Sequence, residues 1–250
     1  QTPLIAHRAI SLMHAAGVPR AALQLLPGRG SKIGAALTGD ARVNGVAFTG
    51  STATALRIRS TMAEHLQPGA PLIAETGGLN AMIVDSTALP EQAVRAIVES
   101  AFQSAGQRCS ALRCLYVQED IAPHFTEMLT GAMKALCPGL PWDLSTDLGP
   151  VIDAEAHAGI AAYVEAARAE GRLLKQIEVP SDGHFIGPAL IRVGGIADLD
   201  REVFGPVLHL ATFRSDELDA VIDAINATGY GLTMAVHSRV EATVNHIVNR

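Results

Sequence analysis

The sequence has few cysteines, few charged residues, and no long run of basic or of apolar residues. Its three cysteines, Cys109, Cys114 and Cys137, form no CxxC pair, so a disulfide framework is not expected and a reducing cytoplasm fits best. The basic residues are scattered and the net charge is −6, which argues against binding of nucleic acid or of an anionic membrane. No apolar run approaches the roughly 20 residues of a membrane-spanning helix. The nine histidines show no HExxH spacing, so a metal site is not predicted.

The composition and the periodicity of the sequence are those of a globular α/β protein. Hydrophobic residues make up 48% of the 250 residues and charged residues 18%, enough to build a sizeable core. Strand-like runs alternate with helical periodicity, which predicts βαβ units and parallel sheets. The glycine pair at 77–78 permits a sharp change of direction and predicts a domain boundary there. Strands are expected near 22–26, 43–49, 71–74, 81–84, 113–117, 189–193, 207–213 and 232–236.

Cys109 is the leading candidate nucleophile. It follows Gly106-Gln107-Arg108 and precedes Ser110 in a polar loop after a strongly periodic helix, whereas a buried structural cysteine normally has apolar neighbours. Arg108 can help to hold a thiolate, and backbone N–H groups of the loop can receive an oxyanion. Cys114, in a predicted strand, and Cys137, near a predicted helix end, are assigned to packing.

Glu75 is the candidate general base. It ends an apolar strand-like run and precedes Thr76-Gly77-Gly78, where close backbone approach is expected. Phe48-Thr49-Gly50-Ser51 places a glycine and hydroxyl groups before a predicted helix, which is a favourable phosphate site as well as an ordinary helix cap. Glu202-Val203-Phe204-Gly205-Pro206 reads by itself only as a turn.

These four segments occur in the order typical of the NAD(P)-dependent aldehyde dehydrogenase superfamily, and the resemblance spans essentially the whole chain. The serine after Cys109 and the run at 75–85 resemble the L-glutamate γ-semialdehyde (pyrroline-5-carboxylate) dehydrogenases, including the dehydrogenase module of bifunctional proline utilisation proteins. The resemblance implies an α/β fold in which residues 1–77 form the C-terminal part of a Rossmann-type NAD-binding domain. Residues 78–250 would then be the catalytic, thiol-bearing domain, truncated at its end.

The resemblance also implies roles for single residues. Cys109 would attack the aldehyde, its backbone N–H would help to hold the oxyanion, and Glu75 would activate the water that hydrolyses the thioester. In the cofactor site, the resemblance places Gly50 and Ser51 at the pyrophosphate. It places Pro27 and Gly28 on the adenosine side, Glu202 at the nicotinamide ribose and Phe204 nearby. Ser110 would bind the substrate carboxylate, with Arg108 supplying positive charge.

The family pattern includes parts that this chain does not contain: a ribose-binding lysine, an oxyanion-hole asparagine, the first cofactor strands and the loop that anchors the substrate carboxylate. We therefore expect the chain to be an internal segment that is inactive alone. The resemblance implies that the parent protein is a homo-oligomer. Whether a proline dehydrogenase module is fused to it stays open. NAD is the expected cofactor, although the sequence does not separate NAD from NADP. Three alternatives stay open: another semialdehyde dehydrogenase, such as one acting on succinate semialdehyde; a non-catalytic structural segment; and a thiol hydrolase or acyltransferase.

Overall fold

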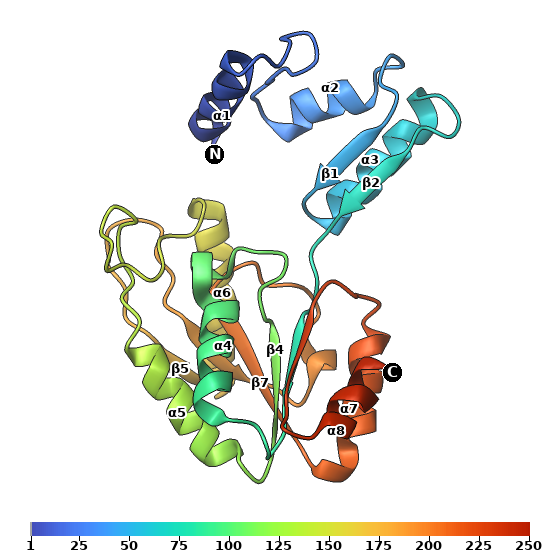
Figure 1. Ribbon diagram of the computed structural model, residues 1–250. Coiled ribbons are helices and arrows are strands. Elements are labelled where there is room, and N and C mark those ends of the chain that lie inside the picture. Colours follow the sequence, from blue (N-terminus) through green and yellow to red (C-terminus); the bar gives the residue numbers. More distant parts are fainter. Residues whose placement is uncertain (1) are drawn as a thin grey trace. The chain divides into compact units, whose positions relative to one another are not determined.

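The computed structural model describes residues 2–250, which divide into two compact units (Figure 1). The first unit reaches to Thr76 and the second is Gly77–Arg250. Among the residues described, no helix is both long and apolar enough to cross a membrane.

The first unit is built around two parallel strands and the helix that connects them. Strand β1 (Val46–Thr49) pairs with β2 (Leu72–Glu75), so that Thr49 lies opposite Glu75. Helix α3 (Thr52–His65) is the crossover that a parallel pair requires. Three helical segments precede this βαβ unit: α1 (Pro3–Ala15), the π-helix η1 (Gly30–Gly34) and α2 (Ala35–Thr38).

The strand predicted at 22–26 is wrong, because this segment is irregular and mostly exposed. The Ala22 N–H donates to the carbonyl of Pro19, which begins the segment with a turn. Its run of apolar residues has no strand beside it within residues 2–250, since the small sheet contains only β1 and β2. An extended segment without a neighbouring strand gains no ladder hydrogen bonds, so local apolar character alone does not make it a strand.

The second unit contains a six-stranded sheet in the order β5-β6-β7-β4-β3-β8. Every neighbouring pair is parallel except β5 and β6, which are antiparallel. The strands are β3 (Ala81–Val84), β4 (Cys114–Gln118), β5 (Leu173–Gln176), β6 (Ala189–Arg192), β7 (Val207–Phe213) and β8 (Met234–His237).

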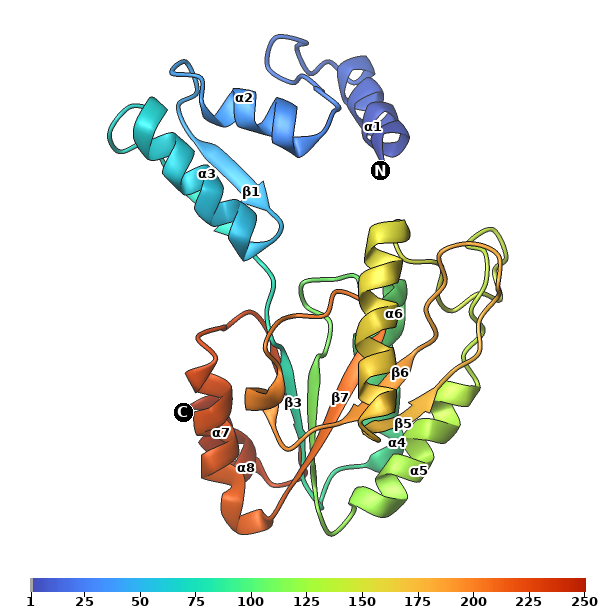
Figure 2. The ribbon, with the colours of Figure 1, turned by 180° about the vertical axis from the view of Figure 1, so that it is seen from behind.

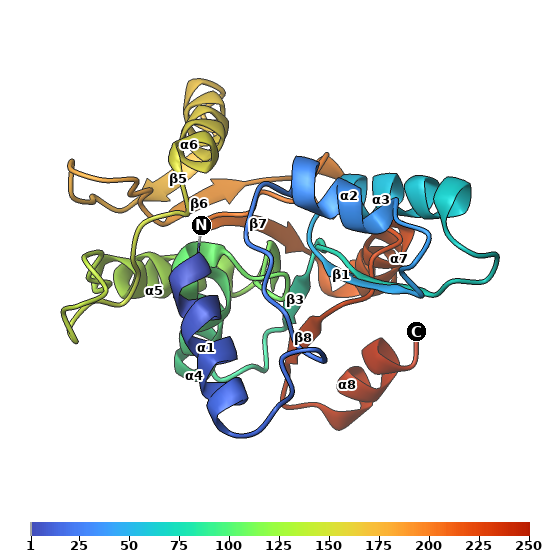
Figure 3. The same ribbon diagram turned by 90° about the horizontal axis from the view of Figure 1, so that it is seen from above.

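Helices cover both faces of this sheet, because alternate strand residues are apolar on both sides. In β4, Leu115 and Val117 pack into one core with α4 (Pro90–Phe102) and α5 (Ala122–Lys134). Cys114 and Tyr116 face the opposite core, and α6, α7 and α8 pack on that side of the sheet. Figures 2 and 3 show the resulting three layers. The remaining helical segments are α6 (Ala154–Ala169), α7 (Leu218–Ala227), α8 (Glu241–Val248), η2 (Gln103–Gly106), η3 (Ile196–Asp198) and η4 (Ser215–Glu217).

The strands predicted at 81–84 and 207–213 match β3 and β7 residue for residue. Strand β5 was not predicted. It is a half-buried antiparallel edge strand that contains Lys175 and Gln176, so it shows neither the continuous apolar run of a buried strand nor a clear alternation.

Three of the loops singled out in the sequence lie at one edge of the second sheet. Gly77-Gly78 precedes β3, the Cys109 loop precedes β4, and the Glu202 loop precedes β7. Because these strands are parallel, their N-terminal ends lie at the same edge. The topology therefore brings the three loops together.

Candidate active site

The Cys109 loop begins with an unusual backbone segment at the end of α4. Ser104, Ala105 and Gly106 have φ values of 57°, 53° and 65°, so three successive residues are left-handed. Non-glycine residues in this region cost roughly 1–3 kcal/mol each and persist where the surrounding structure fixes them. The Leu112 N–H returns to the carbonyl of Ser100 in α4 and closes the loop. Cys109 lies exposed within it as a free thiol.

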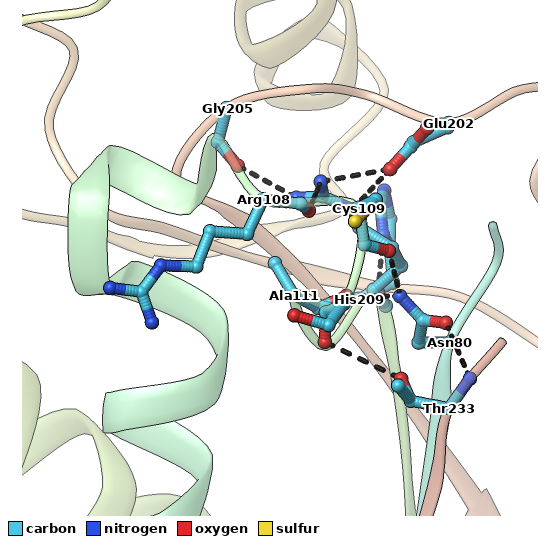
Figure 4. Close-up of polar contacts among 10 residues, drawn as sticks. Asn80, Arg108, Cys109, Ala111, Glu202, Gly205, His209 and Thr233 are labelled. Carbon is cyan, nitrogen blue, oxygen red and sulfur yellow. Dashed lines mark hydrogen bonds and ion pairs between the residues drawn. The ribbon is translucent and has the colours of Figure 1, made fainter. Parts of the chain in front are cut away.

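Buried side chains hold the peptide groups on both sides of Cys109. The Asn80 amide nitrogen Nδ2 donates to the carbonyl of Cys109 at 2.7 Å and to that of Ala111 at 2.8 Å. Asn80 Oδ1 accepts from the Thr233 N–H at 3.2 Å, which joins the start of β8 to the same network (Figure 4). On the other side, Arg113 Nη2 donates to the carbonyl of Arg108 at 3.0 Å. The backbone around the thiol is thus held from within the core.

Arg113 connects the Cys109 loop to the Glu202 loop. Its side chain is 1% exposed, and its Nε and Nη2 atoms donate to Glu202 Oε1 at 3.3 and 3.0 Å. Its Nη1 donates to the carbonyl of Gly205 at 3.2 Å, and its guanidinium lies 5.4 Å from the centre of the Phe204 ring. Burial lowers the pKa of Arg113, whereas the nearby Glu202 carboxylate raises it.

Two glycines allow the motif loops to approach this closely. A Cβ atom on Gly106 would overlap the carbonyl group of Gly205, and one on Gly77 would overlap the carboxylate of Glu202. The Gly77-Gly78 segment, the Cys109 loop and the Glu202 loop therefore interlock at the N-terminal edge of the sheet. These three motifs are far apart in the sequence, and the fold brings them into contact.

A buried histidine, His209, contacts the backbone of Arg113. His209 Nδ1 lies 2.8 Å from the carbonyl of Arg113, and its Nε2 lies 2.8 Å from the Tyr163 hydroxyl. A neutral ring with its hydrogen on Nδ1 satisfies both contacts, because the carbonyl accepts and the hydroxyl donates. Burial lowers the pKa of His209 to about 4, so the ring is neutral at pH 7.

Arg108 and Ser110 flank Cys109 but make different contacts. The Arg108 guanidinium donates to Gln103 Oε1 and Ser104 Oγ in η2, and its side chain extends away from the thiol in Figure 4. Ser110 is exposed, and its carbonyl accepts from the Thr233 hydroxyl at 3.4 Å.

Sequence reasoning assigned no site role to Arg113, Asn80 or His209. An available signal was a charged or polar residue at the start of an apolar run. Arg113 begins the predicted strand at 113–117, and Asn80 directly precedes the apolar strand at 81–84. A polar side chain at such a position is buried and must find partners.

The remaining predicted site residues lie in the first unit. Glu75 is the last residue of β2 and is exposed, and its carbonyl accepts from the Gly50 N–H. Ser51 caps α3, its hydroxyl accepting from the Thr54 N–H at 3.3 Å. The N–H groups of Thr52 and Ala53 have no acceptor within residues 2–250. A helix start of this kind suits a phosphate group.

A groove of about 840 Å³ lies between the η1–α2 segment, β1 and α3, and Gly50 and Ser51 do not line it. Its size is within the range of small-molecule and cofactor sites. Pro27 and Gly28 lie just before η1 and are not among the lining residues. The lining residues include Ser31, Thr38, Phe48, Thr54 and Arg57.

The site also has features that bear on a cofactor ribose and on metals. Glu202 Oε1 accepts both Arg113 N–H groups, while Oε2 has no hydrogen-bond partner within the described chain. That oxygen can accept from a hydroxyl group such as those of a ribose. In the same part of the chain, no cluster of three or more His, Cys, Asp or Glu side chains could hold a metal ion.

Comparison with known proteins bears on the family and the fold of the chain. The model of the aldehyde dehydrogenase family matches residues 1–250. The bifunctional protein PutA of Escherichia coli is 50% identical over 99% of the chain, which spans 20% of that relative. A crystal structure of a bifunctional proline utilization A protein superimposes with a TM-score of 0.96 at 48% identity, over the whole chain and 25% of that structure. The 1-pyrroline-5-carboxylate dehydrogenase from Thermus with bound NAD gives a TM-score of 0.88 at 31% identity.

The Thermus match covers 98% of this chain and 48% of that structure, so the chain spans half or less of each of these relatives. The α/β fold with its parallel sheets is the fold of these dehydrogenases. The family match over the whole sequence and the structural match agree, and the chain belongs to the aldehyde dehydrogenase family.

Proposed function

We propose that this chain carries the nucleophile of an NAD-dependent dehydrogenase that oxidises L-glutamate γ-semialdehyde, the open form of pyrroline-5-carboxylate, to glutamate. The observation that carries the proposal is an exposed Cys109 whose two flanking peptides are held by buried Asn80 and Arg113. The substrate is suggested by the relatives, one of which is named for 1-pyrroline-5-carboxylate and holds NAD.

In the proposed reaction, the Cys109 thiolate adds to the aldehyde carbon, and the carbonyl oxygen becomes an oxyanion that the Cys109 N–H can stabilise. Loss of hydride from that carbon leaves an acyl group on the sulfur as a thioester. The nicotinamide of NAD, when bound, supplies the acceptor for this hydride. Glu75 then removes a proton from the attacking water, which releases glutamate and regenerates the thiolate.

For the cofactor, we propose that Gly50 and Ser51 lie at the pyrophosphate, supported by the open N–H groups at the start of α3. Pro27 and Gly28 are proposed on the adenosine side. Glu202 would accept a hydrogen bond from the nicotinamide ribose through its open Oε2, with Phe204 beside it.

For the substrate carboxylate, we propose Ser110, which is exposed next to Cys109. Arg108 would add positive charge there by leaving its contacts with Gln103 and Ser104.

We further propose that the first unit is the C-terminal part of the NAD-binding domain and that the second is the catalytic domain. By analogy with the bifunctional relatives, the longer protein would join this module to a proline dehydrogenase. It would assemble as a homo-oligomer and work in the cytoplasm.

The test is NADH formation by the full-length protein that contains this chain, with pyrroline-5-carboxylate as substrate. Cys109→Ser should abolish NADH formation. Glu75→Gln should form about one equivalent of NADH per site and then stop, because the thioester forms but is not hydrolysed. Turnover that survives Cys109→Ser would refute the proposal. Faster oxidation of succinate semialdehyde would instead favour another semialdehyde dehydrogenase of the family.

A further inference from the structure

We propose that Arg113 is a positioning residue that orients the peptide between Arg108 and Cys109, so that the Cys109 N–H faces the substrate oxygen. This inference rests on the proposed function, because it assigns a cause to the oxyanion donor of that reaction. Arg113 would act through the backbone and would not touch the substrate.

The geometry of a trans peptide is the first step. Such a peptide places its carbonyl oxygen and its N–H on opposite sides, and no cis peptide occurs within residues 2–250. The Arg108 carbonyl accepts from Arg113 Nη2 at 3.0 Å and from the Ala111 N–H at 3.1 Å. Fixing the carbonyl on one side fixes the Cys109 N–H on the other.

The open donor is the second step. The Cys109 N–H has no acceptor in the part of the chain that the structure describes. The next peptide is held as well, since the Cys109 carbonyl accepts from Asn80 at 2.7 Å. An N–H held in one direction with no internal partner is what stabilisation of a developing oxyanion requires.

The choice of arginine is the third step. Arg113 donates at once to the Arg108 carbonyl, the Gly205 carbonyl and the Glu202 carboxylate from a planar, fully buried fork. A lysine keeps the charge, but its single ammonium on a flexible stem does not reproduce this set of contacts. Arg113→Lys therefore separates the orienting function from the charge.

Two reactions of Cys109 test the inference in the full-length protein that contains this chain, assayed without NAD. With p-nitrophenyl acetate, the thiolate forms a bond to the ester carbon, and p-nitrophenolate leaves after an oxyanion intermediate. With iodoacetamide, the thiolate displaces iodide directly, and no oxyanion forms. Both reactions need an exposed thiolate, but only the first needs the oriented N–H.

We expect Arg113→Lys to slow acylation by roughly tenfold to a hundredfold, somewhat less than the loss of an oxyanion donor. Alkylation should change by less than about threefold, because charge and exposure are retained. The matched control is Arg95→Lys, which alters an exposed arginine of α4 that pairs with Glu99, and it should leave both rates unchanged. If acylation and alkylation fall together, or if neither falls in Arg113→Lys, the inference is overturned.

Thermal melting followed by circular dichroism checks that each variant is folded at the assay temperature. If Arg113→Lys is not, the paired change of Arg113→Gln with Glu202→Gln leaves neither a buried cation nor a buried carboxylate without its partner, and it is judged by the same ratio of the two rates. Failure of the positioning role of Arg113 can be distinguished from failure of the proposed function. If unmodified protein is acylated no faster than its Cys109→Ser variant, the proposed nucleophile fails. If it is acylated at Cys109 but the ratio is unchanged in the Arg113 variants, only the positioning role fails.

Discussion

Replacing Gly106 by alanine should distort the Cys109 loop and destabilise the second unit. Gly106 has a φ of 65°, and a Cβ there would overlap the carbonyl group of Gly205. A left-handed Cβ costs about 1–2 kcal/mol, and forcing an extra carbon into a packed site costs about 1–3 kcal/mol. The neighbour is backbone and cannot rotate away, so the two costs add to roughly 2–5 kcal/mol.

For a unit of this size, such a loss lowers Tm by roughly 4–20 °C, which thermal melting followed by circular dichroism measures. The control is Ser104→Gly, two residues earlier, where the exposed serine has a φ of 57°. That change removes the strain without creating an overlap, while it loses an exposed hydrogen bond from Arg108 and adds freedom to the unfolded chain, so Tm should change little. If Gly106→Ala lowered Tm by less than about 3 °C, the close approach to Gly205 would not hold the loop.

The other expected outcomes concern Gly77, His209 and Ser51. Gly77→Ala should shift the Glu202 carboxylate from Arg113 and lower Tm less than Gly106→Ala does, because a side chain can yield where backbone cannot; an equal loss in a melting experiment would contradict this. Since the folded pKa of His209, about 4, lies below the ordinary value of 6.5, the unfolded chain binds the proton more readily. Stability should therefore fall by about 2–3 kcal/mol as the pH drops from 6.5 toward 4. Urea unfolding measures the loss, and His209→Gln should abolish this part of it. Ser51→Ala removes the cap of α3 and should destabilise the first unit by about 0.5–2 kcal/mol, which hydrogen exchange of that helix measures; an unchanged exchange rate would argue against the cap.

The sequence predicted most elements of the fold because the core strands and helices carry strong, local patterns. Apolar residues on α4 recur at helical spacing, β3 is a continuous apolar run, and β7 is apolar except at His209 and Thr212, so each could be recognised alone. The failures occurred where the pattern depends on neighbours. The segment 22–26 lacks a strand beside it, and β5 forms as the antiparallel partner of β6.

The candidate site divides in the same way. Cys109 and Glu75 were selected from their local context and the family motifs, and their roles stay predictions. Arg113 and Asn80 were missed because their importance comes from contacts between segments far apart in the chain. Arg108, the cation nearest to Cys109 in sequence, contacts the start of η2 instead. Local sequence reasoning selected the adjacent cation, whereas the fold brings a buried one against the same loop.

Three residues that hold the Cys109 loop, called its anchors here, each lie directly before a strand of the second sheet. Asn80, Arg113 and Thr233 are the residues directly before β3, β4 and β8. Each strand fixes the backbone of its own anchor, and the side chains of the anchors then reach sideways to the Cys109 loop. Ligands of open parallel sheets usually bind at the C-terminal ends of the strands, but the Cys109 loop lies at the N-terminal edge. There the orientation of the thiol and of its N–H depends on the packing of the sheet itself, so changes in Arg113 or Asn80 should slow the acylation of Cys109 more than its alkylation.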